Sequence, residues 1–403
     1  MEWEWDVRRI IPVVEGFRRP VELVTARLSK LRQGTHEVLQ VASCFGSIVT
    51  ESILDRISPT PVFSHLQKAV AKGFIRYDTG SRTYYFAHDI VQEAAYKMIT
   101  NQEREAFHLA IGRQLWKSFS KIDELEHHIF LILGQIKEGA THIISQEERN
   151  DVAALCLRAG ELAICSSSFQ TASDYLQLGV SMLGSQSWSN EYELTLELYS
   201  AAAEVEFCVG HMDNSEDLNA AIIANSRQFS DATRAHSIRV YALGSRGHML
   251  KAIERGLKVL EGLGEKFPTK QSVNSVAVAM KRTKWAIGNR SDNDLLRLPL
   301  MDQPEKLAAM KIMNIMFLYA YMAVPALAPL IATRMVKVTL KYGLCDTSSV
   351  GFVTYGMLLC GSGNNVDEGS RFGELAMLLF NKFETKAWLG RMVVWFYGSI
   401  CVW

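Results

Sequence analysis

The adjacent pair His88 and Asp89 is the place in this sequence where residue types and spacing best suit chemistry. A histidine can exchange a proton or a hydrogen bond near neutral pH, and an aspartate in a first helical turn suits the positive end of the helix dipole. The preceding residues, Thr83–Phe86, are β-branched and aromatic and predict a strand, whereas apolar residues over 90–98 recur at helical spacing. We therefore expect the pair at a strand-to-helix junction.

The spacing of this pair leaves two interpretations open. In the first, the pair only caps the helix that follows, because polar residues at helix starts accept hydrogen bonds from free backbone N–H groups. In the second, His88 contacts a ligand. From the residues of this chain alone, capping is the favoured interpretation.

Other chemical constellations are absent from the sequence. It contains no Gly-Lys pair, hence no phosphate-binding P-loop, and none of the H-E-x-x-H, G-x-S-x-G or G-x-G-x-x-G motifs. The neighbours His127 and His128 would point to different faces of a helix and predict no metal site. Cys44 lies among apolar residues and is expected in the core. The acidic run over 122–126 is expected to be an exposed face, and we expect no catalysis, metal or cofactor in this chain.

Composition favours a folded, intracellular protein. The 403 residues are 48% hydrophobic and 21% charged, which is enough for two or three structural units. Lys+Arg and Asp+Glu are equal at 43, so no overall field attracts nucleic acid or an anionic membrane. The 7 cysteines are dispersed and odd in number, which argues against a disulfide framework and favours a reducing cytoplasm. The charged N-terminus does not resemble a signal peptide.

Residues 21–103 predict a winged-helix domain. The turn over 78–81 separates two short β-prone runs, 73–77 and 83–86, and predicts a hairpin. Short helices followed by a two-stranded wing form the winged-helix variant of the helix-turn-helix. The helices are expected over 21–31, 35–45 with Thr35 as its cap, 51–57 and 62–72.

A winged helix raises the question of DNA binding. The helix that would enter a groove, over 62–72, carries only Lys68 and Lys72 as cations. The wing tip offers Arg82 alone, beside Asp78. Because phosphate neutralisation needs several lysines or arginines, we expect this domain to face protein and not nucleic acid.

The chain beyond residue 103 is predicted to be helical, with connecting helices over 104–150, expected at 104–119 and 129–140, and helical repeats over 151–403. The tripeptide Gly-His-Met begins at Gly210 and again at Gly247, in the turns of successive hairpins. A recurrence at about 40 residues is the signature of an α-solenoid. The paired helices are expected over 151–165 and 171–183, 191–208 and 215–225, 233–243 and 250–263, 306–321 and 327–342, and 349–359 and 369–380.

Two stretches of this repeat region have weaker patterns. Residues 267–303 are less periodic and predict a long crossover or an irregular helix. A last helix is expected over 387–403, where the chain stops within an apolar run. Because solenoids normally end in a polar cap, the chain is expected to be part of a longer protein.

Residues 312–333 carry no charge and are long enough to be a transmembrane candidate. Pro325 and Pro329 fall in the second half of this run. A residue before proline is pushed out of helical geometry, so the run divides more naturally into two buried helices joined at 323–325. A membrane span is the less favoured alternative.

Three strings carry a resemblance to a known family: RLSKLRQGTHEVLQVASCFG at 27–46, FAHDIVQEAAYKMI at 86–99, and AGELAICSSSFQTASDYLQLG at 159–179. They resemble the region that follows the nucleotide-binding core in large STAND-type signalling ATPases, the predicted AAA ATPases joined to serine/threonine or histidine kinases and cyclases. The resemblance extends over the whole chain, more faintly beyond residue 179. It implies a mainly α fold, with a linker over 1–20, the winged helix, and a tetratricopeptide-like superhelix.

The resemblance also implies a role for His88 and Asp89. They resemble the MHD element of STAND proteins, in which the histidine contacts the diphosphate of a bound nucleotide. The Walker motifs and sensor arginine of the family are not in this chain, so ATP or ADP is expected only in a full-length parent with a nucleotide-binding core in cis.

The chain itself is then expected to be a non-catalytic regulatory arm of such a parent. Its partner would be a protein or peptide on the concave face of the superhelix. Two alternatives stay open from the sequence: a transcriptional regulator whose winged helix contacts DNA, and a membrane-attached scaffold that uses residues 312–333.

Overall fold

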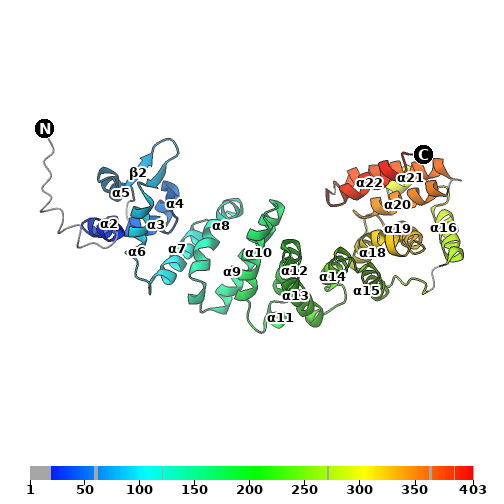
Figure 1. Ribbon diagram of the computed structural model, residues 1–403, viewed down its shortest axis with the longest axis horizontal. Helices are drawn as coiled ribbons and strands as arrows, with labels where there is room; N and C mark the ends of the chain where they lie inside the picture. The colour runs from blue at the N-terminus through cyan, green and yellow to red at the C-terminus, as the bar shows by residue number, and fades with distance from the viewer. Residues whose placement is uncertain are drawn as a thin grey trace. The chain divides into compact units, whose positions relative to one another are not determined.

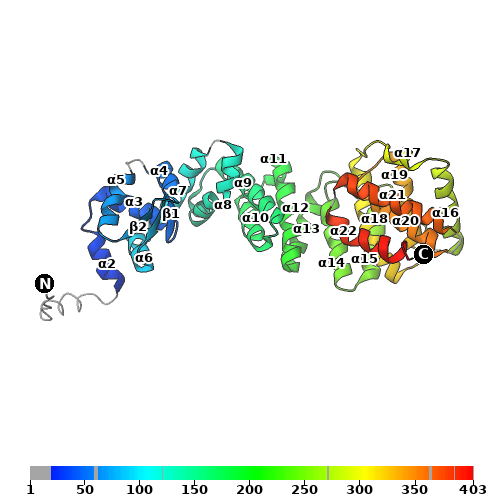
Figure 2. The same ribbon diagram turned by 90° about the horizontal axis from the view of Figure 1, so that it is seen from above.

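The computed structural model describes residues 20–58, 62–119, 121–269, 272–362, 365–384 and 386–402. The fold is mainly α, as expected (Figures 1 and 2). The chain divides after Ser185 into two compact units. The predicted linker over 1–20 lies, except for Pro20, outside the described residues, and so do residues 363–364 of the last predicted hairpin turn.

The first unit begins with a winged-helix topology. Its sheet is antiparallel in the order β1-β3-β2, and Tyr84 of β3 lies opposite both Val49 of β1 and Tyr77 of β2. The strand β1 was not predicted, because a run of this length with one buried side chain carries too little alternation to be recognised. The elements are α2 Pro20–Leu28, α3 Gln33–Ser43, β1 Ile48–Thr50, α4 Glu51–Ile57, α5 Val62–Ala71, β2 Ile75–Asp78, β3 Thr83–Phe86 and α6 Asp89–Lys97.

The predicted cap of the second helix is wrong. The helix α3 begins at Gln33, and Thr35 lies inside its first turn with 1% of its surface exposed. No side chain caps α3, and the residue at its N-cap is Arg32. Burial of Thr35 against the core therefore outweighed its preference for a helix start.

The rest of the first unit consists of helices packed in sequence: α7 Arg104–Ser118, α8 Ile122–Glu138, the short 3₁₀ helix η1 Ala140–His142, α9 Gln146–Cys165 and α10 Phe169–Met182. Both α8 and α9 begin earlier than the predicted starts at residues 129 and 151. Their first turns are rich in acidic residues, which interact favourably with the helix dipole. Because these turns carry too few apolar residues to show helical spacing, the sequence pattern did not reveal them as helix.

The second unit continues with helical hairpins, in which α12 packs on α13, α14 on α15, α18 on α19, and α20 on α21 (Figure 1). The elements are α11 Ser187–Asn190, α12 Tyr192–Val209, α13 Met212–Asn225, α14 Thr233–Ser245, α15 Met249–Gly262, α16 Val273–Ile287, α17 Asp292–Leu296, α18 Pro304–Ala323, α19 Ala328–Tyr342, α20 Ser348–Gly361, α21 Val366–Phe383, η2 Lys386–Trp388 and α22 Leu389–Ser399.

The hairpin turns share one backbone geometry. Gly210 and Gly247 have φ values of 93° and 81°, a left-handed conformation that glycine adopts without strain. In each turn the next residue is a histidine, His211 or His248, whose N–H donates to the carbonyl oxygen five positions back at 2.9 Å. Ser167 takes the same place between α9 and α10 with a φ of 59°. The repeat in the sequence thus corresponds to a repeated turn.

The first residues after these turns pack where helices meet. Ala172 in α10 and Ala252 in α15 follow their turns at the same distance, and each has 0% of its surface exposed. We expect Ala172→Leu and Ala252→Leu each to lower the free energy of unfolding by about 1–3 kcal/mol, since no space receives the added carbons. Denaturant melts measure this. The exposed Ala220 is the control, and Ala220→Leu should be neutral; two neutral buried variants would contradict the repeat alignment.

The weakly periodic stretch 267–303 contains more regular structure than predicted. The helix α16 spans Val273–Ile287 and begins with a reciprocal capping box between Ser272 and Ser275. A second capping box, between Ser291 and Asp294, begins α17. The helix α16 exposes Val273 and Trp285 to solvent at 85% and 87%, and this placement of apolar residues obscures its period.

The uncharged run 312–333 forms two buried helices, as predicted. The helix α18 ends at Ala323 and α19 begins at Ala328, so the prolines fall in the connection and in the first turn of α19. Side chains such as Met313, Met316 and Ile331 have 0% of their surface exposed and belong to the core of the second unit. Within the described residues, we find no helix whose length and apolar content would let it cross a membrane.

Candidate functional site

The structure places His88 and Asp89 at the predicted junction between β3 and α6. His88 occupies the N-cap position of α6, and its Nδ1 accepts a hydrogen bond from the Ile90 N–H at 3.2 Å. Asp89 is the first residue of the helix, and both side chains are exposed. The capping interpretation is therefore satisfied by the geometry, and contact with a nucleotide remains a prediction.

A chain of hydrogen bonds joins the winged helix to the helices that follow. The Gln135 Nε2 donates to the Cys44 carbonyl oxygen at 3.0 Å, so its Oε1 is the atom that accepts from His108 Nδ1 at 2.7 Å. The other ring nitrogen of His108 is then an acceptor, and the Tyr96 hydroxyl donates to it over 2.9 Å. His108 and Gln135 are 5% and 6% exposed, so the bond between them is shielded from water. The bonds to Tyr96 and to the Cys44 carbonyl are partly buried.

A second attachment joins α4 to the end of α7. The Arg56 Nη1 donates to the Ser118 carbonyl oxygen at 2.7 Å, and its guanidinium lies 4.4 Å from the centroid of the Phe119 ring. In return the Gln114 Nε2 donates to the Arg56 carbonyl oxygen at 3.3 Å. Two separate contacts therefore fix the winged helix to α7 and α8 within the first unit.

The remaining candidates from the sequence have structural roles. Burial raises the pKa of the Cys44 thiol to about 12, so it stays protonated and is a poor nucleophile. The rings of His127 and His128 lie 4.9 Å apart, edge to face. His128 also stacks on Phe119 with ring centroids 4.2 Å apart. Among the described residues, no group of three or more potential ligands is arranged to hold a metal.

The cation at the wing tip is engaged within the domain. The Arg82 Nε donates to the Glu51 carboxylate at 2.9 Å, and the Tyr77 hydroxyl donates to the same oxygen at 3.0 Å. The Glu51 side chain is 8% exposed. Arg82 thus neutralises a buried carboxylate inside the protein, which reduces its capacity to bind a phosphate.

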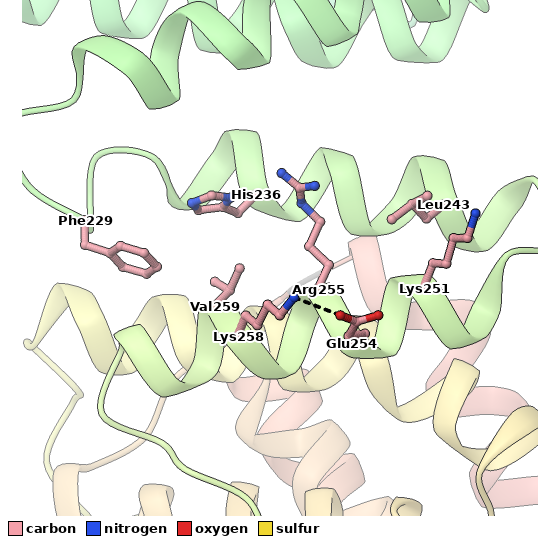
Figure 3. Close-up of a pocket in the computed structure, with 8 residues that line it drawn as sticks. All are labelled: Phe229, His236, Leu243, Lys251, Glu254, Arg255, Lys258 and Val259. Carbon is pink, nitrogen blue, oxygen red and sulfur yellow. Dashed lines mark hydrogen bonds and ion pairs between the residues drawn. The ribbon is translucent and has the colours of Figure 1, made fainter. Parts of the chain in front are cut away.

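A pocket that the sequence did not predict lies between α14 and α15. It is open to solvent, and its volume is about 570 Å³ (Figure 3). Lys251, Arg255 and Lys258 of α15 line it, together with the carboxylate of Glu254. Its other walls are His236 and the apolar side chains Phe229, Leu243 and Val259.

The polar groups of this pocket are only partly paired. The Glu254 carboxylate accepts a hydrogen bond from Lys258 Nζ at 2.8 Å, in a pair whose side chains are 67% and 74% exposed. Arg255 extends from α15 toward α14 beside His236 (Figure 3), and its buried Nε has no hydrogen-bond partner in the described structure. The buried Nδ1 of His236 also has none.

The electrostatics of the pocket favour an anion. Burial, then the charges of Arg255 and Arg239, lower the pKa of His236 to about 4, so this ring is neutral at pH 7. Burial, then the nearby Arg239, also lower the pKa of the Arg255 guanidinium, which nevertheless remains charged. The sequence did carry one signal for this site, because Lys251, Arg255 and Lys258 share one face of a helix.

Comparison with known proteins gives limited similarity. No family model matches the chain. It is 23% identical to Hybrid signal transduction histidine kinase G of Dictyostelium discoideum over 485 residues, an alignment that covers 99% of this chain and 14% of the kinase. The chain therefore spans a small part of the length of that relative.

A solved structure, that of a Signal Transduction ATPase with Numerous Domains (STAND) protein with a tetratricopeptide repeat sensor from Pyrococcus horikoshii, is 14% identical. The match covers 95% of this chain and 56% of the other, with a TM-score of 0.39. That score is below the level at which two chains are taken to share a fold.

Proposed function

We propose that this chain is the regulatory and protein-interaction arm of a STAND-type signalling ATPase, and that it has no catalytic activity of its own. The winged helix would contact a nucleotide-binding core in cis, and the helical hairpins would receive a protein or peptide partner. The arm would hold the core in its closed state until the partner binds. We place this function in the cytoplasm, with which seven free cysteines are consistent.

The observation that carries this proposal is the hydrogen-bond chain from Tyr96 through the buried side chains of His108 and Gln135 to the Cys44 carbonyl. Coupling between a sensor and a switch domain can be carried by hydrogen-bond networks that have two discrete arrangements. Buried polar contacts of defined direction are suited to this, because displacement leaves unpaired groups that each cost about 1–3 kcal/mol. The similarity to a signal transduction kinase along nearly the whole chain supports the same role.

The two alternative functions have less support. A DNA-contacting winged helix would need several free cations, and Arg82 at the wing tip is paired with Glu51. A membrane scaffold would need residues 312–333 at its surface, and most of the apolar side chains of this run lie in the core of the second unit, with Tyr321 and Met322 as exposed exceptions. Retention on a DNA column at physiological salt would favour the first alternative over our proposal.

The role of His88 gives the proposal its test. In a protein that joins this chain to a nucleotide-binding core, His88 would donate a hydrogen bond to the diphosphate of ADP and stabilise the closed state. We expect His88→Asn to raise the basal signalling output about tenfold to a hundredfold, as loss of a charge-assisted hydrogen bond shifts a two-state equilibrium by that factor. The output is measured as turnover without the activating partner.

Asparagine is chosen because it separates the two roles of His88. Its side-chain oxygen is among the best N-caps, so it can replace the acceptor for the Ile90 N–H without replacing the imidazole. An unchanged output with an unchanged melting temperature would mean that His88 is only a cap. The isolated 403-residue chain should bind no ADP, with or without the substitution; tight binding by this chain alone would contradict the proposal.

A further inference from the structure

The pocket between α14 and α15 has the features of a built binding site. Its volume of about 570 Å³ falls within the range of pockets that bind organic ligands. Its cationic side chains, Lys251 and Arg255, come from α15. Its apolar side chains are Leu243 of α14, Val259 of α15 and Phe229, which precedes α14 (Figure 3). A ligand that fits both sets of side chains must carry a negative charge and an apolar group close together.

Arg255 is the central cation of the pocket. Its Nε is buried without a partner, and within the described part of the chain the guanidinium makes no ion pair. Two carboxylates of the neighbourhood are paired with other cations: Glu254 with Lys258, and Glu216, whose charge also acts on Arg255, with Arg239. A buried donor without a partner costs about 1–3 kcal/mol. The guanidinium therefore keeps hydrogen-bonding capacity that the protein itself does not use at this atom.

His236 adds a neutral polar group beside this cation. The buried Nδ1 of its ring has no partner, and the ring centroid lies 5.4 Å from that of Phe229. The Phe229 side chain is 43% exposed at the pocket, where it offers apolar surface to a ligand. An inorganic phosphate would fill only a fraction of this volume and would leave the apolar side chains exposed to water.

We propose that the α14–α15 pocket binds an acidic segment of a partner protein, with a carboxylate on Arg255 and Lys251 and a neighbouring apolar side chain against Phe229, Leu243 and Val259. A carboxylate matches the fork of the guanidinium and can accept two hydrogen bonds from it. This inference deepens the proposed function, because it assigns a site and a chemical class to the partner of the arm.

The test is selection of a random short-peptide library on the full 403-residue chain. We expect the selected peptides to be enriched in Asp or Glu next to a large apolar residue, and their affinity to fall as salt is raised. Absence of acidic enrichment, or absence of any selected peptide, would overturn the proposal. Competition of a selected peptide by equimolar inorganic phosphate or ADP would also overturn it, since the site would then be one for phosphate.

Charge-matched variants locate the binding. Arg255→Gln and Lys251→Gln should each weaken the binding of a selected peptide, by about tenfold or more for Arg255. Glu254→Gln should strengthen it, because it removes a negative charge from the lining of the pocket. Arg282→Gln removes the same charge from α16, outside the pocket, and should leave the affinity unchanged. Equal affinities for the Arg255 and Arg282 variants would contradict the assignment.

Lys251 is exposed, so its variant remains informative if Arg255→Gln lowers stability. Peptide binding is measured here without a nucleotide core. If no peptide binds, the pocket is not the partner site, and the test of the proposed function on His88 is unaffected.

Discussion

Glu265→Gln is expected to lower the free energy of unfolding by about 3–5 kcal/mol, as removal of one partner from a buried ion pair does. The Glu265 carboxylate follows α15 and is 8% exposed. It accepts from Lys306 Nζ of α18 at 2.7 Å and from Arg334 Nη1 of α19 at 2.8 Å. The glutamine would leave two cations, 12% and 29% exposed, without their counter-charge.

The same contribution should depend on pH. Burial alone would raise the pKa of Glu265, but the hydrogen bonds from Lys306 and Arg334 outweigh it and hold the pKa below its ordinary value. A depressed pKa in the folded state adds stability above the unfolded pKa of about 4.3, and this stability is lost as the pH falls through the folded value. The difference between wild type and Glu265→Gln should therefore be largest near neutral pH and shrink below about pH 4.

Urea melts at a series of pH values measure both effects. The control is Glu261→Gln on the same segment, where the pair with Lys266 is exposed at 58% and 77%. Exposed pairs contribute about 0–1 kcal/mol, so this variant should remain close to wild type. Similar losses for Glu261→Gln and Glu265→Gln would show that the cluster around Glu265 is not a buried anchor.

Gly343→Ala is the second substitution with a large expected effect. Gly343 ends α19 with φ 107° and ψ −176°, a region that only glycine occupies without strain. A Cβ at this position would also overlap the Pro299 carbonyl oxygen, to which the Leu344 N–H donates at 2.7 Å. We expect a loss of about 3 kcal/mol or more, because strain and steric overlap add at one residue.

Gly247→Ala is the matched control for this effect. Gly247 also has a positive φ, 81°, but no atom lies within 4 Å of the position that its Cβ would take. Only the left-handed backbone conformation is then penalised, by about 1–2 kcal/mol. Thermal melts of both variants separate the cost of backbone strain from the cost of steric overlap. Equal losses of stability in the two variants would mean that the backbone at Pro299 moves away from the added Cβ at no cost.

Local features of the fold could be predicted wherever neighbouring residues determine the backbone. The helix α4 has the predicted bounds, Glu51–Ile57, because apolar spacing and flanking turn residues mark both ends. The Gly-His-Met turns were recognisable because a glycine with positive φ ends a helix in the same way each time. The division of 312–333 followed from its prolines, which restrict the residues before them.

Features that depend on distant residues could not be predicted. The strand β1 exists because Val49 pairs with Tyr84, far along the chain, and its own residues give no strand pattern. Thr35 was predicted as a cap from its residue type, but it lies inside the first turn of α3, where its side chain is buried in the core. The hydrogen-bond chain through His108 joins elements on both sides of the predicted domain boundary at residue 103, where no local pattern indicates a contact.

For the candidate sites, the sequence by itself determined the position of His88 and Asp89, because a change from strand to helical period marks their junction. The spacing of Lys251 and Arg255, four positions apart, also places both cations on one face of α15. Only the tertiary structure decided that the Arg255 Nε is buried without a partner and that Glu254 is already bound to Lys258. Pairing and burial depend on which helices meet, and helical period fixes only the direction in which a side chain leaves its own helix.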